Sequence, residues 1–72
     1  MTVLQLREKA VAEAEAAREI KDKADQEARG LTQEEAQQID NHIKEAERVE
    51  QEAQRQEKLE ELETRLNKPQ EP

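Results

Sequence analysis

Residues 27–40 read EARGLTQEEAQQID, and they interrupt a sequence that otherwise favours continuous helix. This stretch contains Gly30, the one glycine of the chain, directly after Arg29. A cation suits the C-terminal end of a helix, and glycine suits the left-handed residue that closes it. Thr32 and Glu35 have the spacing of a capping box, in which both side chains bind backbone amides at a helix start. The stretch therefore predicts a tight turn between two helices.

The segments on both sides of this turn have helical periodicity. Apolar residues recur three or four positions apart, at Val3, Leu6, Ala10, Ala14, Ala17, Ile20, Ala24 and Ala28, and again at Ala36, Ile39, Ile43, Ala46, Val49 and Ala53. We predict one helix over about 3–29, a turn at 30–32 and a longer helix over about 33–67. A connection this short indicates an all-α antiparallel helical hairpin of coiled-coil type over residues 1–67. The two prolines in residues 68–72 predict a linker or disordered tail.

A second set of apolar residues does not fit the hairpin stripes. Three leucines near the end of the second helix are spaced by three and four residues, and at about 100° per residue they project roughly opposite to Ile39. Two apolar residues of the first helix lie about 90° from its stripe. The five residues are Leu4, Val11, Leu59, Leu62 and Leu66. We interpret them as a self-association surface that contacts other copies of this chain.

Composition limits what the chain can do. It has 72 residues, no aromatic residue and no cysteine, and 43% of its residues are charged. A single core of this size rarely supplies more than roughly 3–5 kcal/mol, so a lone monomer would be marginally stable. An acidic hairpin with thin apolar stripes should associate only weakly, so we expect weak homo-oligomers. The net charge of −7, with twelve acidic and six basic residues in 30–72, disfavours binding to nucleic acid. Without a long apolar run we expect no membrane partner and a soluble chain.

The candidate chemical sites are weak. His42 and Glu45 could supply two metal ligands, but no further ligand completes the set, and we expect both on a solvated helix surface. Glu34 and Glu35 are adjacent and diverge on a helix, so capping explains them better than acid–base catalysis. Serine and cysteine nucleophiles are absent. We therefore predict no catalytic residue, no metal and no cofactor. Arg29 is either a helix-end cation or a contact made during assembly.

The sequence from Leu4 to Leu66 resembles the N-terminal delta domain of Hong Kong 97-type major capsid proteins of tailed bacteriophages. In that family an acidic helix is followed by a short break and a second acidic helix. The residues here that match the break are Arg29, Leu31, Thr32, Glu34, Glu35 and Asp40. Ile39 stands where the family commonly has an aromatic residue, and Gly30 where it often has an acidic one.

The resemblance implies an internal scaffolding domain. In the family this domain precedes the capsid fold, points into the procapsid and promotes association of the capsid protein. A maturation protease removes it before or during DNA packaging. On this interpretation the chain is a fragment located inside the procapsid in the host cytoplasm, and residues 68–72 begin a linker towards the cleavage region.

Two other functions fit the same residues. The chain could be a generic helical-hairpin interaction module of a larger protein with no role in a phage. It could also be a small acidic regulator that binds a basic partner through its second helix, since complementary charge gives specificity and rapid association. A salt-sensitive complex with a basic protein would identify this last function.

Overall fold

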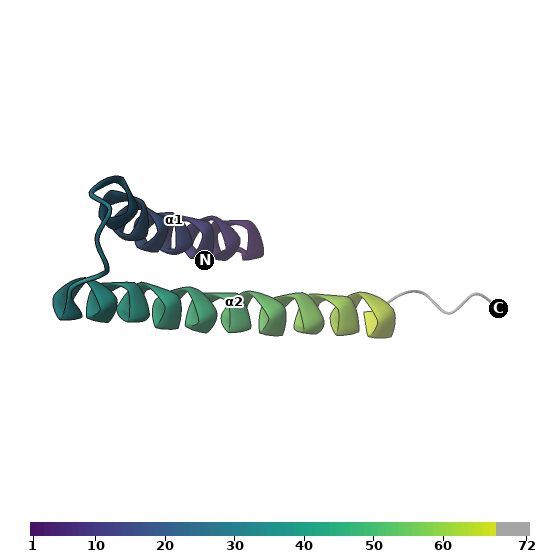
Figure 1. Cartoon of the computed structure of the whole chain (residues 1–72). Coiled ribbons are helices and arrows are strands. Elements are labelled where there is room, and N and C mark those ends of the chain that lie inside the picture. The colour runs from purple at the N-terminus through teal and green to yellow at the C-terminus, as the bar shows by residue number, and fades with distance from the viewer. Residues whose placement is uncertain (68–72) are drawn as a thin grey trace.

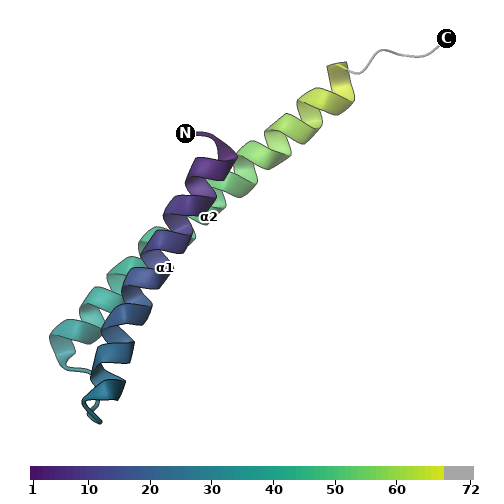
Figure 2. The same ribbon diagram turned by 90° about the horizontal axis from the view of Figure 1, so that it is seen from above.

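Residues 1–67 form two antiparallel α-helices joined by a short connection (Figure 1). The computed structural model describes residues 1–67. Helix α1 spans Val3–Gln26 and helix α2 spans Gln33–Asn67, and the two helices pack along each other (Figures 1 and 2). The predicted all-α hairpin with a longer second helix is confirmed. The predicted tail at 68–72 lies outside the described residues.

Helix α1 begins with a capping box that the sequence analysis missed. The backbone amide of Gln5 donates to Thr2 Oγ1 at 3.1 Å, and the amide of Thr2 donates to Gln5 Oε1 at 2.9 Å. Each bond satisfies a backbone amide that has no partner within the helix. The spacing of Thr2 and Gln5 matches that of Thr32 and Glu35, so the same sequence pattern could have located this cap.

The C-terminal end of α1 differs from the prediction. The helix ends at Gln26, not Arg29, and the left-handed residue is Ala28, with φ of 53°, not Gly30. The Arg29 amide donates to the Ala24 carbonyl at 3.1 Å, and the Ala28 amide donates to the Asp25 carbonyl at 3.0 Å. This pair of bonds is a Schellman motif, which requires its left-handed residue two positions after the last helical residue. Ala28 occupies that position.

The core lies along one line of contact between the helices, which we call the seam. Its largest cluster contains Leu6, Val49 and Ala53, with Val3 and Ala10 packed against them. Towards the turn the fully buried residues are two alanines, Ala17 and Ala24, and Ile20 and Ile39 are partly buried. Alanine buries little area but permits close approach of the helices. The fully buried side chains larger than alanine, Leu6 and Val49, therefore lie at the end of the hairpin away from the turn.

Within the two helices, the seam departs from the predicted stripes at two positions; Ala28, also predicted to lie in the stripe, is exposed and lies outside α1. Ala14 and Ile43 were predicted to face the other helix, but both are exposed. Glu13 and His42 are partly buried in their place. The observed seam keeps an alternating spacing of three and four residues, a period of 3.5 that two supercoiled helices maintain. The prediction placed Ala14 and Ile43 in the seam because they are apolar, although the period of 3.5 residues places Glu13 and His42 there.

Candidate self-association surface

The connection between the helices is held by Arg29. Its Nη1 and Nη2 donate to Glu35 Oε1 and Oε2 at 2.6 and 2.9 Å, and its Nε donates to Glu27 Oε1 at 2.8 Å. Nη1 also donates to the Gly30 carbonyl at 3.1 Å. Paired guanidinium–carboxylate bonds of this kind fix geometry as well as charge. Arg29 therefore ties the end of α1 to the first turn of α2.

Glu35 combines this ion pair with the helix cap. The Glu35 amide donates to Thr32 Oγ1 at 3.1 Å, and the Thr32 amide donates to Glu35 Oε1 at 3.0 Å. The Arg29 guanidinium, assisted by the Thr32 amide, lowers the pKa of Glu35 to about 2. The carboxylates of Glu35 and Glu27 raise the pKa of Arg29. The structure thus brings together three of the residues predicted for the turn. Gly30 contributes its carbonyl, and its backbone is not left-handed.

A polar pair crosses the seam at its middle. His42 Nδ1 lies 2.9 Å from Glu13 Oε1, and both side chains are partly buried. The prediction that His42 lies on a solvated surface is therefore wrong. The sequence analysis missed this pair because it assigned the neighbouring Ala14 and Ile43 to the seam. Among residues 1–67 no cluster of three or more histidine, cysteine or acidic side chains could hold a metal ion.

Ion pairs mark the two edges of the hairpin. Lys9 Nζ lies 3.5 Å from Glu45 Oε1 on one edge, which we call the Lys9 edge. Arg7 pairs with Glu57 on the opposite edge, the Arg7 edge, since residues two apart on a helix point about 200° apart. Arg48, more than Lys9, lowers the pKa of Glu45 to about 2. These side chains are largely exposed, so the pairs contribute little stability and chiefly favour this register.

Helix α2 continues beyond the start of α1 (Figure 2). Its last ten residues, 58–67, are all exposed, and we call this segment the extension. At 1.5 Å per residue it is about 15 Å long. Leu59, Leu62 and Leu66 are 55%, 39% and 69% exposed there. The extension is therefore an apolar-bearing helix that α1 does not cover.

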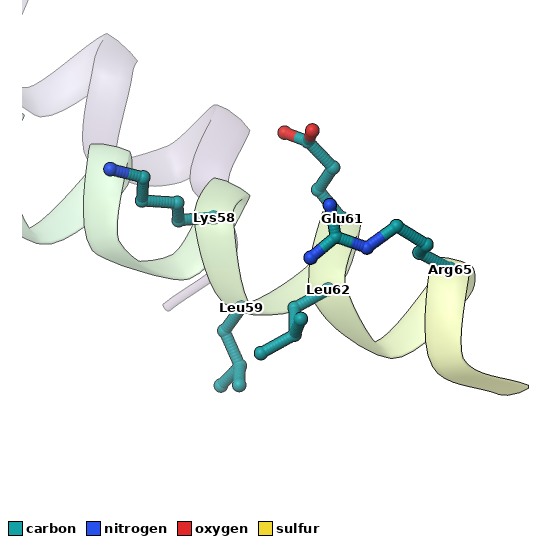
Figure 3. Close-up of a pocket in the computed structure, with 5 residues that line it drawn as sticks. All are labelled: Lys58, Leu59, Glu61, Leu62 and Arg65. Atoms are coloured by element: carbon teal, nitrogen blue, oxygen red, sulfur yellow. The ribbon is translucent and has the colours of Figure 1, made fainter.

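The leucines of the extension do not continue the hairpin seam. Continued along α2 with its spacing of three and four, the seam reaches Glu60, Glu63 and Asn67, which are polar. Leu59 and Leu66 lie roughly a quarter turn away, in line with Glu45 on the Lys9 edge, because whole multiples of seven residues separate them. Figure 3 shows Leu59 and Leu62 on the side of α2 opposite Glu61. The three leucines form a separate stripe, which we call the leucine stripe.

Leu4 and Val11 lie elsewhere on the hairpin. They are exposed on α1, three residues before and four residues after Arg7, and therefore flank Arg7 on its own side of the helix. The leucine stripe follows the Lys9 edge instead. The five residues predicted to form one surface are thus divided between two sides of the molecule. One partner helix cannot cover both sets together.

The depression at the extension is open and shallow. Lys58, Leu59, Glu61, Leu62 and Arg65 surround it, and all five project from α2 alone (Figure 3). A gap between side chains of one helix does not enclose a small molecule, whereas ligand sites are usually concave and lined from several elements. The geometry is that of a helix face, which suits contact with another helix.

No helix within residues 1–67 combines the length and the apolar character needed to cross a membrane. Comparisons of this chain with protein-family models, with curated proteins and with solved structures find no match.

Proposed function

We propose that this chain is an internal scaffolding domain of a Hong Kong 97-type phage capsid protein, which acts by weak self-association of α2. The observation that carries the self-association is the leucine stripe, exposed on an extension that α1 does not cover. The phage role comes from the resemblance around the turn, from Arg29 to Asp40. The Arg29 and Thr32 contacts with Glu35 give those residues a structural task that is compatible with this role.

Physical chemistry favours a reversible contact. Three leucines per chain offer a small apolar area, and a net charge of −7 on each copy opposes association at low salt. Many copies tethered to one growing shell nevertheless gain avidity from their high local concentration. Such a contact supports assembly while each individual pair can still dissociate and correct its position.

The remaining partners follow from the resemblance. The capsid protein that this domain precedes would carry it into the interior of the procapsid in the host cytoplasm. A maturation protease would then remove it. The acidic surface supplies a physical reason for removal, because a chain of charge −7 repels DNA that enters the same volume.

Sedimentation equilibrium over a wide concentration range tests the self-association. Interference optics are required because the chain has no aromatic chromophore, and far-UV circular dichroism of the same samples reports helix content. We expect a helical chain that associates weakly, and more strongly when salt screens its charge. A helical monomer at every concentration and salt would refute the self-association.

A pair of variants locates the contact. Leu59→Ser with Leu66→Ser should abolish association, because it removes two members of the leucine stripe. Leu4→Ser with Val11→Ser, on the other side of the hairpin, is the matched control and should leave association unchanged. A greater loss in the control would assign the contact to α1 instead. The phage role is tested separately, by whether a capsid fold follows residue 72 in the parent protein and whether deletion of this domain prevents shell assembly.

A further inference from the structure

The leucine stripe carries charges in a pattern that distinguishes the two possible orientations of a partner helix. Its leucines are spaced by three and four residues, as along the seam of a two-stranded coiled coil. Lys58 directly precedes Leu59, and Glu63 directly follows Leu62. Lys58 and Glu63 therefore lie on opposite flanks of the stripe. Side chains at these flanking positions form the ion pairs that set partner orientation in coiled coils.

We infer that two copies of the chain pair through their extensions as a parallel, in-register coiled coil, with Lys58 of each copy facing Glu63 of the other. This inference rests on the proposed self-association and specifies its geometry. The occupant of the leucine stripe is thus the leucine stripe of a second copy. Each leucine contacts its own counterpart across a two-fold axis parallel to the helices.

Charge complementarity selects the parallel orientation. In a parallel coiled coil, a flanking residue of one helix approaches the residue five positions later on the partner helix. Lys58 of each copy therefore approaches Glu63 of the other copy, and two ion pairs form. In an antiparallel pair, equivalent flanks face each other. Lys58 would then face Arg65, and Glu63 would face Glu63. Like charges in contact disfavour the antiparallel arrangement.

The charges needed for this contact are available. Among residues 1–67, neither Lys58 nor Glu63 takes part in an ion pair. The positions that would continue the stripe towards the turn are occupied by charged residues already paired within the chain. These are Glu45 with Arg48 at 2.6 Å and Glu52 with Arg55 at 2.8 Å. Pairing is therefore confined to the extension, and α1 does not have to move.

The small size of this contact explains why it would be weak. A stable coiled coil normally sustains its apolar pattern over three or four heptads, whereas the extension holds three leucines over about 15 Å. Such a contact is much smaller than the roughly 1,200 Å² that stable interfaces bury. Parallel pairing also brings Asn67 of both copies to the same end of the dimer. If each copy is followed by a capsid domain, the two capsid domains would therefore join the shell next to each other.

Charge reversal tests the orientation by sedimentation equilibrium at low salt. Lys58→Glu and Glu63→Lys should each weaken dimerisation about fivefold, from the loss of two exposed ion pairs, and the double variant should recover wild-type affinity. Net charge alone predicts a different result, since Glu63→Lys lowers the negative charge and would strengthen association. An antiparallel pair predicts that Lys58→Glu dimerises more tightly than wild type, because the new glutamate would face Arg65 of the other copy.

The matched controls are Lys44→Glu and Glu47→Lys, which make the same charge changes on exposed residues of α2 outside the extension. They measure the effect of net charge alone. If Lys58→Glu and Glu63→Lys change the affinity only as these controls do, the inferred ion pairs do not exist. Circular dichroism of each variant checks that helix content is kept.

Disulfide trapping gives an independent measurement, because the native chain has no cysteine. Under mild oxidation Leu59→Cys and Leu66→Cys should each crosslink to itself, and a mixture should give no excess of the mixed dimer. A dominant crosslink between position 59 of one copy and position 66 of the other would overturn the parallel arrangement while keeping self-association. A wild-type chain that stays monomeric would overturn the proposed self-association itself.

Discussion

Replacing Leu6 by alanine should remove most of the stability of the hairpin. Leu6 is 5% exposed and belongs to the same buried apolar cluster as Val49 and Ala53. The substitution removes three buried carbon groups, which corresponds to about 2–3 kcal/mol at about 0.8 kcal/mol for each. A domain of this size has only roughly 3–5 kcal/mol in total. The ratio of folded to unfolded hairpin should therefore fall by a factor between about 30 and about 160.

Leu4→Ala provides the matched control for this prediction. Leu4 lies two residues away on the same helix, and the same atoms are removed, but its side chain is 66% exposed. Its substitution should change the free energy of unfolding by less than about 0.5 kcal/mol. Both variants have nearly the same intrinsic helix propensity, since leucine and alanine are both strong helix formers. The difference between them therefore isolates the contact between α1 and α2.

Urea and thermal unfolding followed by far-UV circular dichroism measure this difference. The samples should be dilute, because self-association would add stability that depends on protein concentration. We expect a much lower unfolding midpoint for Leu6→Ala than for Leu4→Ala. Equal losses in the two variants would refute the assignment of Leu6 to the core. A larger loss in Leu4→Ala would show that α1 packs through the opposite face.

Two further predictions concern the turn. Ala28→Gly should raise the free energy of unfolding by about 1 kcal/mol, because glycine adopts the left-handed conformation without steric cost. Gly30→Ala should not lower the free energy of unfolding, because an added Cβ at Gly30 meets no atom within 4 Å and φ is not positive there. If urea unfolding showed that Gly30→Ala destabilises the hairpin and Ala28→Gly does not stabilise it, Gly30 rather than Ala28 would be the left-handed residue. The pKa of Glu35 is lowered from 4.5 to about 2, so the unfolded chain binds more protons between these values and stability should be lost as pH falls from about 4.5 to about 2. Glu45 titrates in the same window, so the test compares wild type with Arg29→Ala, whose acid-dependent loss should be smaller; equal losses would contradict the ion pair.

The pair formed by His42 and Glu13 is a polar contact within an otherwise apolar seam. A polar contact at a seam position usually costs stability but specifies register, because only one alignment satisfies both side chains. Here the alignment that joins Glu13 to His42 is also the one that pairs Lys9 with Glu45. The polar contacts therefore favour one register in a seam whose alanines discriminate little between alternatives.

The sequence alone determined the features that depend on near neighbours in the chain. The helix start at Gln33 could be predicted from Thr32 and Glu35, because a capping box joins residues only three apart. The absence of proline and glycine on both sides of the turn, with the apolar periodicity, was sufficient for two helices. The short connection between them then required an antiparallel hairpin.

Only the tertiary structure decided the features that depend on one helix packing against the other. The left-handed residue is Ala28 rather than Gly30, because α1 ends at Gln26 and the Schellman motif places its left-handed residue two positions later. Glu13 and His42 enter the seam because supercoiling imposes a period of 3.5 residues, whichever side chains occupy those positions. The leucine stripe lies on a different side of the hairpin from Leu4 and Val11. The side on which a residue lies depends on how each helix is rotated about its own axis, and packing against the other helix sets that rotation.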